Sequence, residues 1–566
     1  MSNSLFRRKT IDHIIAEGSD GSHGTGLKRV LNVKDLTFFG IAAILGAGSF
    51  SSLGGAVFNG GPGVIILFII TGIACAFTAF CYSDFASRIP VAGSAYTYAY
   101  ASFGEIFAWI IGWALIMEYS IGNIYVAYSW SDYFTSFLER MHVNIPAYLS
   151  TSYMEAKHAV QANTNNEELL AAWNSAPIFA GIRCIVDLPA LIINILITYL
   201  VYRGVKESKN FSNIMVMLKL GVVLLIILVG GYLVLHNHLT ENWLPSNSEG
   251  VKSFMPNGFK GVMAAVAGVF FAYIGFDAVS VLAEESNNPQ KDLPRGMIYS
   301  LVICTVIYIL LTLVLTGAVH YQQFENIGEP LAFIFEKQNL NVGWMQLLVS
   351  ICAVVAMTSV LLVFQMGQPR IWMSMSRDGL LPPKFQQIHS KYKTPSFSTI
   401  ITGLVVGVPI IFTDKTFVLD FTSIATLFAF VLVCGGVLFL PKKEKEAGKF
   451  HLTFISSKYI FPGIVLLSII IVQFNVTNYF TGIINFNVDQ ATLTYNVSAI
   501  LFWLICLLLA IGAFYKNWSL IPLMGLVTCL YLLTGMTAMN WAWFGAWLLI
   551  GLIVYFMYGN KQSKLA

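Results

Sequence analysis

The chain has 566 residues, of which 56% are hydrophobic and 11% are charged, and its formal net charge is +4. Soluble globular proteins carry a charged share of about 25%, so this composition excludes a soluble protein. Net charge alone does not orient a membrane protein, because orientation depends on where short loops carry Lys and Arg.

Stretches that are apolar and long enough to cross ~30 Å of hydrocarbon recur along almost the whole chain and leave no room for a large soluble domain. The fold class we expect is an all-α integral membrane protein with about 14 transmembrane helices. The predicted spans lie near residues 36–58, 64–88, 105–137, 186–202, 211–235, 259–285, 297–319, 345–375, 397–413, 418–440, 458–475, 495–514, 519–535 and 541–558.

The N-terminal tail, residues 1–35, is polar and contains a run rich in Gly and Ser. We expect no cleavable signal peptide, because the first apolar run begins only after this tail and is itself long enough to span a membrane. Counting spans from the tail puts the loops rich in Lys and Arg on one side, which the positive-inside rule makes the cytoplasm. We therefore predict a multi-pass protein of the cell membrane with both termini, including the C-terminal tail 560–566, in the cytoplasm.

The first span is interrupted at its centre by Gly46-Ala47-Gly48-Ser49, where an uninterrupted membrane helix would favour Leu and Ile. Unwound backbone inside a bilayer is tolerated only where protein covers it or where it lines a cavity. The half-helix after the break would present N–H groups to an anion such as a carboxylate. We expect Ile44, Gly46, Ala47 and Gly48 to bind substrate; the alternative is a close packing face of small residues.

The third span carries Glu118, an ionisable side chain inside the membrane, and Gly122 lies one helical turn further along the same face. Three roles stay open for Glu118: contact with substrate, relay of a proton, and hydrogen bonding to neighbouring helices. The loop after this span, about residues 139–180, is predicted to be a solvated outer cap with room for a short surface helix.

Lys219 is the only basic residue deep in an apolar span, the fifth. A charged Lys there costs at least ~2.5 kcal/mol, so it needs carbonyl or carboxylate partners, or it must lose its proton. Our hypothesis is that Lys219 bridges the first and eighth spans and that its protonation couples the protein to a proton gradient. The alternative is a permanently charged pin between helices.

A second break lies in the sixth span, around Phe270 to Asp277. Freed carbonyls near Phe271, Ala272 and Ile274 can accept hydrogen bonds from an ammonium group, and a phenylalanine ring can close over the ligand, although such rings more often simply pack. An anion site at one break and a cation site at the other indicate a zwitterion. We expect Asp277, on the inner half of this span, to line the cytoplasmic exit.

The eighth span offers Met357-Thr358-Ser359 beside the first break. The hydroxyls of Thr358 and Ser359 are suited to coordinate a cation or to receive Lys219, and Met357 is a candidate for the substrate side-chain pocket, unless it only packs. Seven of the eight cysteines lie inside apolar spans without the spacing of metal ligands. We predict no metal site and no cofactor, with the proton as the coupling ion.

Spans one to five (residues 36–236) and six to ten (258–440) can be superposed with opposite membrane orientation, because five is odd and each set begins with a broken helix. This predicts a five-plus-five inverted repeat over residues 36–440, typical of a secondary transporter. Spans eleven to fourteen, within residues 441–559, carry no charge inside the membrane and are expected to be four peripheral helices.

Several segments together resemble the amino acid, polyamine and organocation transporter superfamily, in particular its cationic amino acid transporter branch and related bacterial members. The resemblance implies alternating access, a substrate site between the breaks of spans one and six, and a proton-linked lysine at Lys219 where sodium-coupled relatives hold a cation. Side-chain specificity stays open between cationic and neutral amino acids. The segments that carry the resemblance are Gly40 to Gly48, Ser87 to Tyr98, Phe270 to Ala278, Met357 to Val360, and Ser374 to Pro382.

The function we expect is proton-coupled uptake of an amino acid by a permease. An exchanger of amino acids is the first alternative, and a transporter-like amino acid sensor the second, although a sensor would carry a sizeable signalling extension. An enzyme is not expected, because the sequence has no His-Glu-x-x-His motif and no nucleophile elbow. The expected partners are an amino acid and the lipid membrane, with no nucleic acid; no oligomeric state follows from the sequence.

Overall fold

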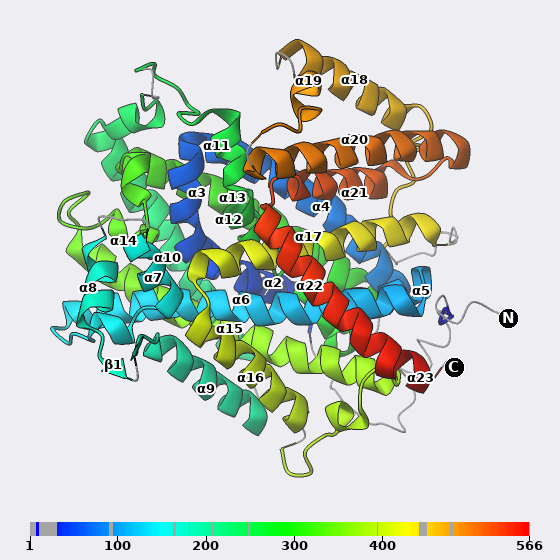
Figure 1. Cartoon of the computed structure of the whole chain (residues 1–566), viewed down its shortest axis with the longest axis horizontal. Helices are drawn as coiled ribbons and strands as arrows, with labels where there is room; N and C mark the ends of the chain where they lie inside the picture. The colour runs from blue at the N-terminus through cyan, green and yellow to red at the C-terminus, as the bar shows by residue number, and fades with distance from the viewer. Residues whose placement is uncertain are drawn as a thin grey trace.

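A computed structural model describes residues 7–10, 31–89, 94–161, 166–179, 181–204, 209–246, 250–392, 394–440, 450–475, 479–488 and 490–564. Parts of the N-terminal tail and residues 90–93 of the Ser87 to Tyr98 segment lie outside the described residues. Helices make up most of the described chain, as the apolar spans predict (Figure 1).

The first predicted span is a broken helix. Its first half, α2 (Val33–Ile44), begins at the N-cap Asn32, whose side chain accepts a hydrogen bond from the Asp35 amide while Asp35 accepts one from the Asn32 amide. After the break the chain continues as the π-helical turn η3 (Gly48–Ser52) and α3 (Leu53–Gly60). The chain then turns through η4 (Gly61–Gly63), where Gly61 has a φ of +58° that glycine adopts readily.

The remaining spans of the first half are α4 (Val64–Arg88), α6 (Glu105–Arg140), α9 (Leu188–Arg203) and α10 (Lys209–His236). Their positions agree with the predicted spans to within a few residues. A helix that the hydropathy pattern did not predict, α5 (Ser94–Ser102), joins α4 to α6.

The second half of the chain also begins with a broken helix. The sixth span consists of α11 (Gly258–Ala264), α12 (Val266–Phe271), a non-helical stretch of residues 272–276, and the 3₁₀ helix η7 (Asp277–Glu285). The helices that follow are α13 (Pro289–Ala318), α15 (Gly343–Arg377), α16 (Ser396–Phe412) and α17 (Lys415–Phe439). In Figure 1, α6 and α15 run lengthwise through the molecule, and the two helices pack against each other.

Eight helical segments in the described part of the chain are long and apolar enough to cross a membrane, and four further apolar helices are shorter. One of the eight, Gly48–Arg88, holds the second half of span one together with span two. The broken span six contributes only short pieces. The described chain is therefore a bundle of apolar helices, and both the total of fourteen spans and the inverted repeat stay predictions.

Four helices of membrane-like composition follow residue 450: α18 (Ile460–Asn475), α20 (Gln490–Lys516), α21 (Leu520–Leu533) and α22 (Ala538–Val554). Here the structure differs from the expectation of four peripheral helices. α21 packs on α17 and α4, and α22 crosses α6 and α17 (Figure 1). α18 and α20 instead share a separate apolar cluster with the start of α21.

The outer cap contains more structure than one short helix. It holds η5 (Ala147–Leu149), α7 (Tyr153–Gln161), α8 (Glu167–Ser175), and a hairpin of β1 (Ile178–Phe179) and β2 (Ile182–Arg183), in which Ile178 pairs with Arg183 and Phe179 with Ile182. The other short elements are η6 (Leu239–Trp243), η8 (Tyr321–Phe324), α14 (Pro330–Phe333), η9 (Pro383–Gln386), α19 (Tyr479–Ile483), η10 (Tyr555–Gly559) and α23 (Asn560–Gln562).

Candidate substrate site

The first break exposes backbone donors. α2 ends at Leu45, whose ψ of 80° leaves the helical region, and the Gly46 amide turns back to the Ile44 carbonyl at 2.9 Å. The Gly46 carbonyl then accepts from the amides of Ser49 and Phe50. Among the described residues, the amides of Ala47 and Gly48 donate no backbone hydrogen bond outside the regular helices. Two neighbouring N–H groups at the start of a half-helix are suited to hold a carboxylate.

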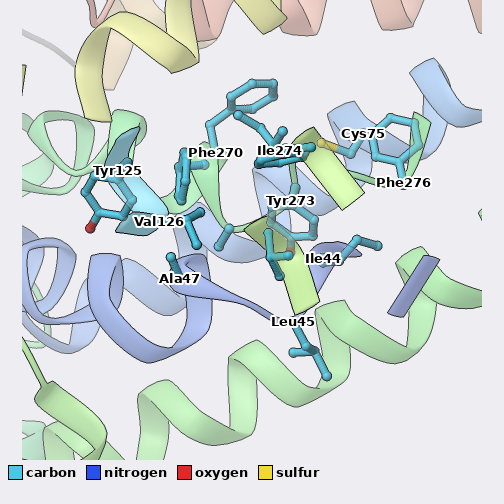
Figure 2. Close-up of a cluster of buried hydrophobic side chains, with 14 of the residues drawn as sticks. Ile44, Leu45, Ala47, Cys75, Tyr125, Val126, Phe270, Tyr273, Ile274 and Phe276 are labelled. Atoms are coloured by element: carbon cyan, nitrogen blue, oxygen red, sulfur yellow. The ribbon is translucent and has the colours of Figure 1, made fainter. Parts of the chain in front are cut away.

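The second break faces the first at very short range. A Cβ atom added at Gly48 would lie 2.5 Å from the Ala272 Cα, and one added at Gly275 would lie 2.9 Å from the Ala43 Cβ. Gly275 also has a φ of +116°, a conformation that favours glycine. In Figure 2 the non-helical chain between Ala47 and Leu45 faces Tyr273 and Ile274. Glycine at both breaks therefore lets the two backbones approach each other.

A small cavity lies between the breaks, with about 10 Å³ of space for water-sized spheres. This is about the space that one water molecule needs, so the two breaks are packed closely together in this structure. Six residues predicted to bind substrate line it, and four lining residues were not predicted. The predicted residues are Ile44, Gly46, Ala47, Gly48, Phe271 and Ile274, and the others are Ala43, Val126, Val360 and Phe364.

Four residues that were expected to bind substrate do not line this cavity, and their role in binding stays a prediction. Met357 is fully buried on α15, but Val360 and Phe364, one and two turns further along the same face, line the cavity in its place. Gly122 stands behind the wall, where an added Cβ would lie 3.1 Å from the Phe364 ring. Ala272 contributes its carbonyl, which takes a hydrogen bond from Tyr308.

Glu118 is the fourth of these residues. It is buried on α6, hydrogen-bonds to Thr426 and interacts electrostatically with Asp277. The Asp277 carboxylate is held by backbone amides of Gly275, Asp277 and Ala278 at the start of η7. The two acids thus lie near each other on α6 and η7, outside the cavity wall, and Asp277 belongs to the second break itself.

Lys219 lies where the hypothesis placed it, between the first and eighth spans. Its side chain is fully buried, and its Nζ donates to the carbonyls of Ala42 at 3.2 Å and Leu45 at 3.4 Å and to the Ser359 hydroxyl at 2.7 Å. The ammonium thus reaches the end of α2 at the first break. Thr358 points elsewhere: its hydroxyl donates to the Val354 carbonyl and accepts from the Trp130 indole.

Sequence reasoning missed Tyr308 on α13. Its hydroxyl lies 2.9 Å from the Ile44 carbonyl and 2.6 Å from the Ala272 carbonyl, so it contacts both breaks. One tyrosine among 25 in an apolar chain gives no signal by composition.

One end of the cavity is covered by a stack of side chains. The ring of Tyr125 on α6 meets Phe271 edge-on at 4.6 Å, and the Lys415 ammonium lies 5.6 Å from the Tyr125 ring centre. Lys415, the first residue of α17, pairs with Asp132 of α6. The aromatic pair, which includes the cavity residue Phe271, therefore lies next to the ion pair of Lys415 and Asp132.

Comparisons with known proteins place these features in context. Residues 31–510 match the family model described as amino acid permease, and residues 520–563 match the model for the C-terminus of these permeases. The branched-chain amino acid permease BcaP of Bacillus subtilis is 35% identical over the full length of both chains. The methylthioribose transporter of the same organism is 34% identical over 100% of this chain and 99% of that protein. The vacuolar cationic amino acid transporter 4 of Arabidopsis thaliana is 35% identical over 77% of this chain and 67% of that protein.

Proposed function

The chain belongs to the amino acid permease family, and from this premise we propose that it imports an amino acid with a neutral, apolar side chain by proton-coupled symport. The observation that carries the proposal is the cavity between the two breaks, whose lining includes Ala47 and Gly48 of the first break and Phe271 and Ile274 of the second. We expect the amides of the first break to hold a carboxylate and the carbonyls of the second break to receive an ammonium group. A zwitterion matches this pair of polarities.

The cavity wall supports a neutral side chain. Apart from the first break and Ala43, which precedes it, the wall is formed by Val126, Phe271, Ile274, Val360 and Phe364, all apolar, while Glu118 stays outside the lining. An apolar wall favours an aliphatic group over a charged one, because a cation would lose its hydration without gaining a partner. The relative BcaP is named for branched-chain amino acids, which agrees with this wall.

Proton coupling is supported by the position of Lys219. Its ammonium holds the carbonyls of Ala42 and Leu45, which belong to the end of α2 at the first break. Loss of its proton would weaken these charge-assisted hydrogen bonds and free that end of α2. Because Leu45 directly precedes the cavity residue Gly46, the protonation state of Lys219 is linked to the geometry of the substrate site.

Uptake into proteoliposomes tests the proposal. The purified full chain is reconstituted, and uptake of labelled Leu, Ala, Arg, Lys and Glu is measured with and without an inward proton gradient. We expect Leu and Ala to accumulate above equilibrium only with the gradient, and Arg, Lys and Glu not to accumulate.

Three outcomes would contradict the proposal in different ways. Accumulation of Arg or Lys in place of Leu would refute the neutral specificity. Uptake that needs an amino acid inside the vesicle and ignores the gradient would identify an exchanger. Inhibition of Leu uptake by excess methylthioribose, together with direct methylthioribose transport, would move the substrate class to that of the second relative.

A further inference from the structure

Tyr308 connects the two breaks through a single hydroxyl group. The side chain is fully buried on α13, and its Oη lies 2.6 Å from the Ala272 carbonyl and 2.9 Å from the Ile44 carbonyl. A hydroxyl carries one proton, so it donates to one of these carbonyls at a time or is shared between them. A third helix thus reaches both halves of the substrate site at one point.

The two carbonyls depend on this hydroxyl to different degrees. The Ile44 carbonyl also accepts from the Gly46 amide at 2.9 Å. In the described chain, no backbone amide outside regular helices donates to the Ala272 carbonyl. A buried carbonyl left without any donor is costly, because it has lost water and gained nothing. Tyr308 removes that cost at the second break.

Ile44 lines the cavity, and Ala272 follows the cavity residue Phe271. In the proposed binding mode, the ammonium group of the amino acid is received by the carbonyls of Ile44 and Ala272. An ammonium has three protons and can donate to both carbonyls at once. When the transporter moves with substrate bound, the substrate supplies these donors. When a symporter returns without substrate, the protein itself must supply them.

We propose that Tyr308 is a positioning residue that supplies this donor during the return of the unloaded transporter. The inference rests on the proposed function, since only net transport needs an unloaded return step. Exchange, in which the site moves loaded in both directions, does not need the hydroxyl. Comparing net uptake with exchange therefore distinguishes this role from a merely structural one. A structural role would affect net uptake and exchange alike.

The test compares net uptake with exchange in Tyr308→Phe. Proteoliposomes are loaded either with buffer, to measure gradient-driven net uptake of labelled Leu, or with unlabelled Leu, to measure exchange. We expect net uptake to fall about tenfold and exchange to fall less than about twofold, the size expected when one buried hydrogen bond is lost in one step only. Retained exchange also demonstrates that the variant is folded.

Tyr273→Phe is the matched control. Tyr273 is also fully buried, and its ring lies 5.5 Å from that of Tyr308. It belongs to the second break, but its hydroxyl donates to the Phe68 carbonyl of α4 and not to the carbonyls of Ile44 and Ala272. We expect this variant to keep the wild-type ratio of net uptake to exchange. Equal loss of both modes in Tyr308→Phe, no loss in either, or the same shift in Tyr273→Phe would overturn the proposal.

The result also distinguishes this inference from the proposed function. A wild-type protein that accumulates Leu with the gradient, combined with an unchanged ratio in Tyr308→Phe, refutes the role of Tyr308 alone. A wild-type protein that only exchanges refutes symport, and the role of Tyr308 in an unloaded return fails with it.

Discussion

At the scale of single residues, two physical roles can be distinguished for Lys219. A permanently charged pin needs only a positive charge that donates to the Ala42 and Leu45 carbonyls and to Ser359. A coupling residue must also release its proton during the cycle. Lysine can do so when it is desolvated, whereas arginine remains charged in proteins.

Replacing Lys219 with Met and with Arg separates these roles. We expect Lys219→Met and Lys219→Arg both to abolish accumulation of Leu driven by a proton gradient, because neither side chain can bind and release a proton. The measurement is uptake into proteoliposomes at several external pH values. Gradient-driven accumulation by Lys219→Arg at the wild-type level would identify a charged pin, and accumulation by Lys219→Met would remove Lys219 from coupling.

At the scale of the elements, the two broken helices depend on glycine for their close approach. Gly48→Ala would place a methyl group 2.5 Å from the Ala272 Cα, which is backbone and cannot move aside alone. We expect Gly48→Ala to lose at least about tenfold in Leu uptake, since the two halves of the site would be pushed apart. Gly55→Ala is the control on the same span, because a Cβ there meets nothing within 4 Å.

Uptake rates and thermal stability are measured for both variants in the same vesicles and detergent. Gly55→Ala should keep wild-type uptake. Wild-type uptake by Gly48→Ala would show that the breaks need not stay in contact, and would weaken the assignment of the substrate site to the space between them.

The connector between α13 and α15 carries a group that titrates near neutral pH. Glu329, which precedes α14, lies 3.6 Å from Arg140 at the end of α6, and burial raises the pKa of its carboxyl to about 8. The folded protein thus holds a proton that the unfolded chain, with an ordinary glutamate pKa of 4.5, has already released. This contribution to stability is full below the unfolded pKa and is lost as the pH rises through about 8.

Glu329→Gln tests the sign of this effect. We expect the Tm of the wild-type protein in detergent to fall between about pH 5 and about pH 9, and the fall to be smaller in Glu329→Gln, whose amide does not titrate. The measurement is thermal unfolding across that pH range. A steeper fall in the variant, or a wild-type Tm that rises with pH over the same range while the variant stays level, would show that Arg140 keeps Glu329 charged.

The breaks could be predicted from the sequence because glycine inside an apolar span is a local signal. The rest of the cavity wall could not, because residues such as Val126, Val360 and Phe364 are apolar residues in apolar spans and nothing local marks which face they occupy. Met357 is an example: it lies on the same helix as the cavity residues Val360 and Phe364, which follow it by one and two turns. Tyr308 lies 36 residues from Ala272, and only the packing of α13 reveals their contact.

At the scale of the whole molecule, the C-terminal helices divide into two pairs. α22 is attached to α6 through tryptophans: the Trp109 indole donates to the Gly551 carbonyl at 2.8 Å, and the Trp113 indole donates to the Trp547 carbonyl at 2.9 Å. α22 therefore supports the helix that carries Val126, while α21 packs on α17 and α4. α18 and α20 instead share a separate apolar cluster with the start of α21.

The two ends of the described chain meet at one end of the bundle. Lys9 pairs with Asp378 at 2.7 Å, and the Lys564 amide donates to the Asp378 carbonyl at 3.1 Å (Figure 1). Termini on the same side require an even number of membrane crossings between them. This is consistent with the fourteen predicted spans, and the prevalence of Lys and Arg in the loops of that side predicts that it faces the cytoplasm.

Cys184 allows this orientation to be measured. It is the one exposed cysteine among the eight, all of which lie in the described chain, and it follows the hairpin of the outer cap. We expect a membrane-impermeant maleimide to label the wild-type protein in intact cells and not to label Cys184→Ser.

In the Cys184→Ser background, Lys564→Cys places a thiol at the opposite end and should be labelled only after the membrane is permeabilised. Labelling of Lys564→Cys in intact cells, with Cys184 protected until permeabilisation, would invert the orientation.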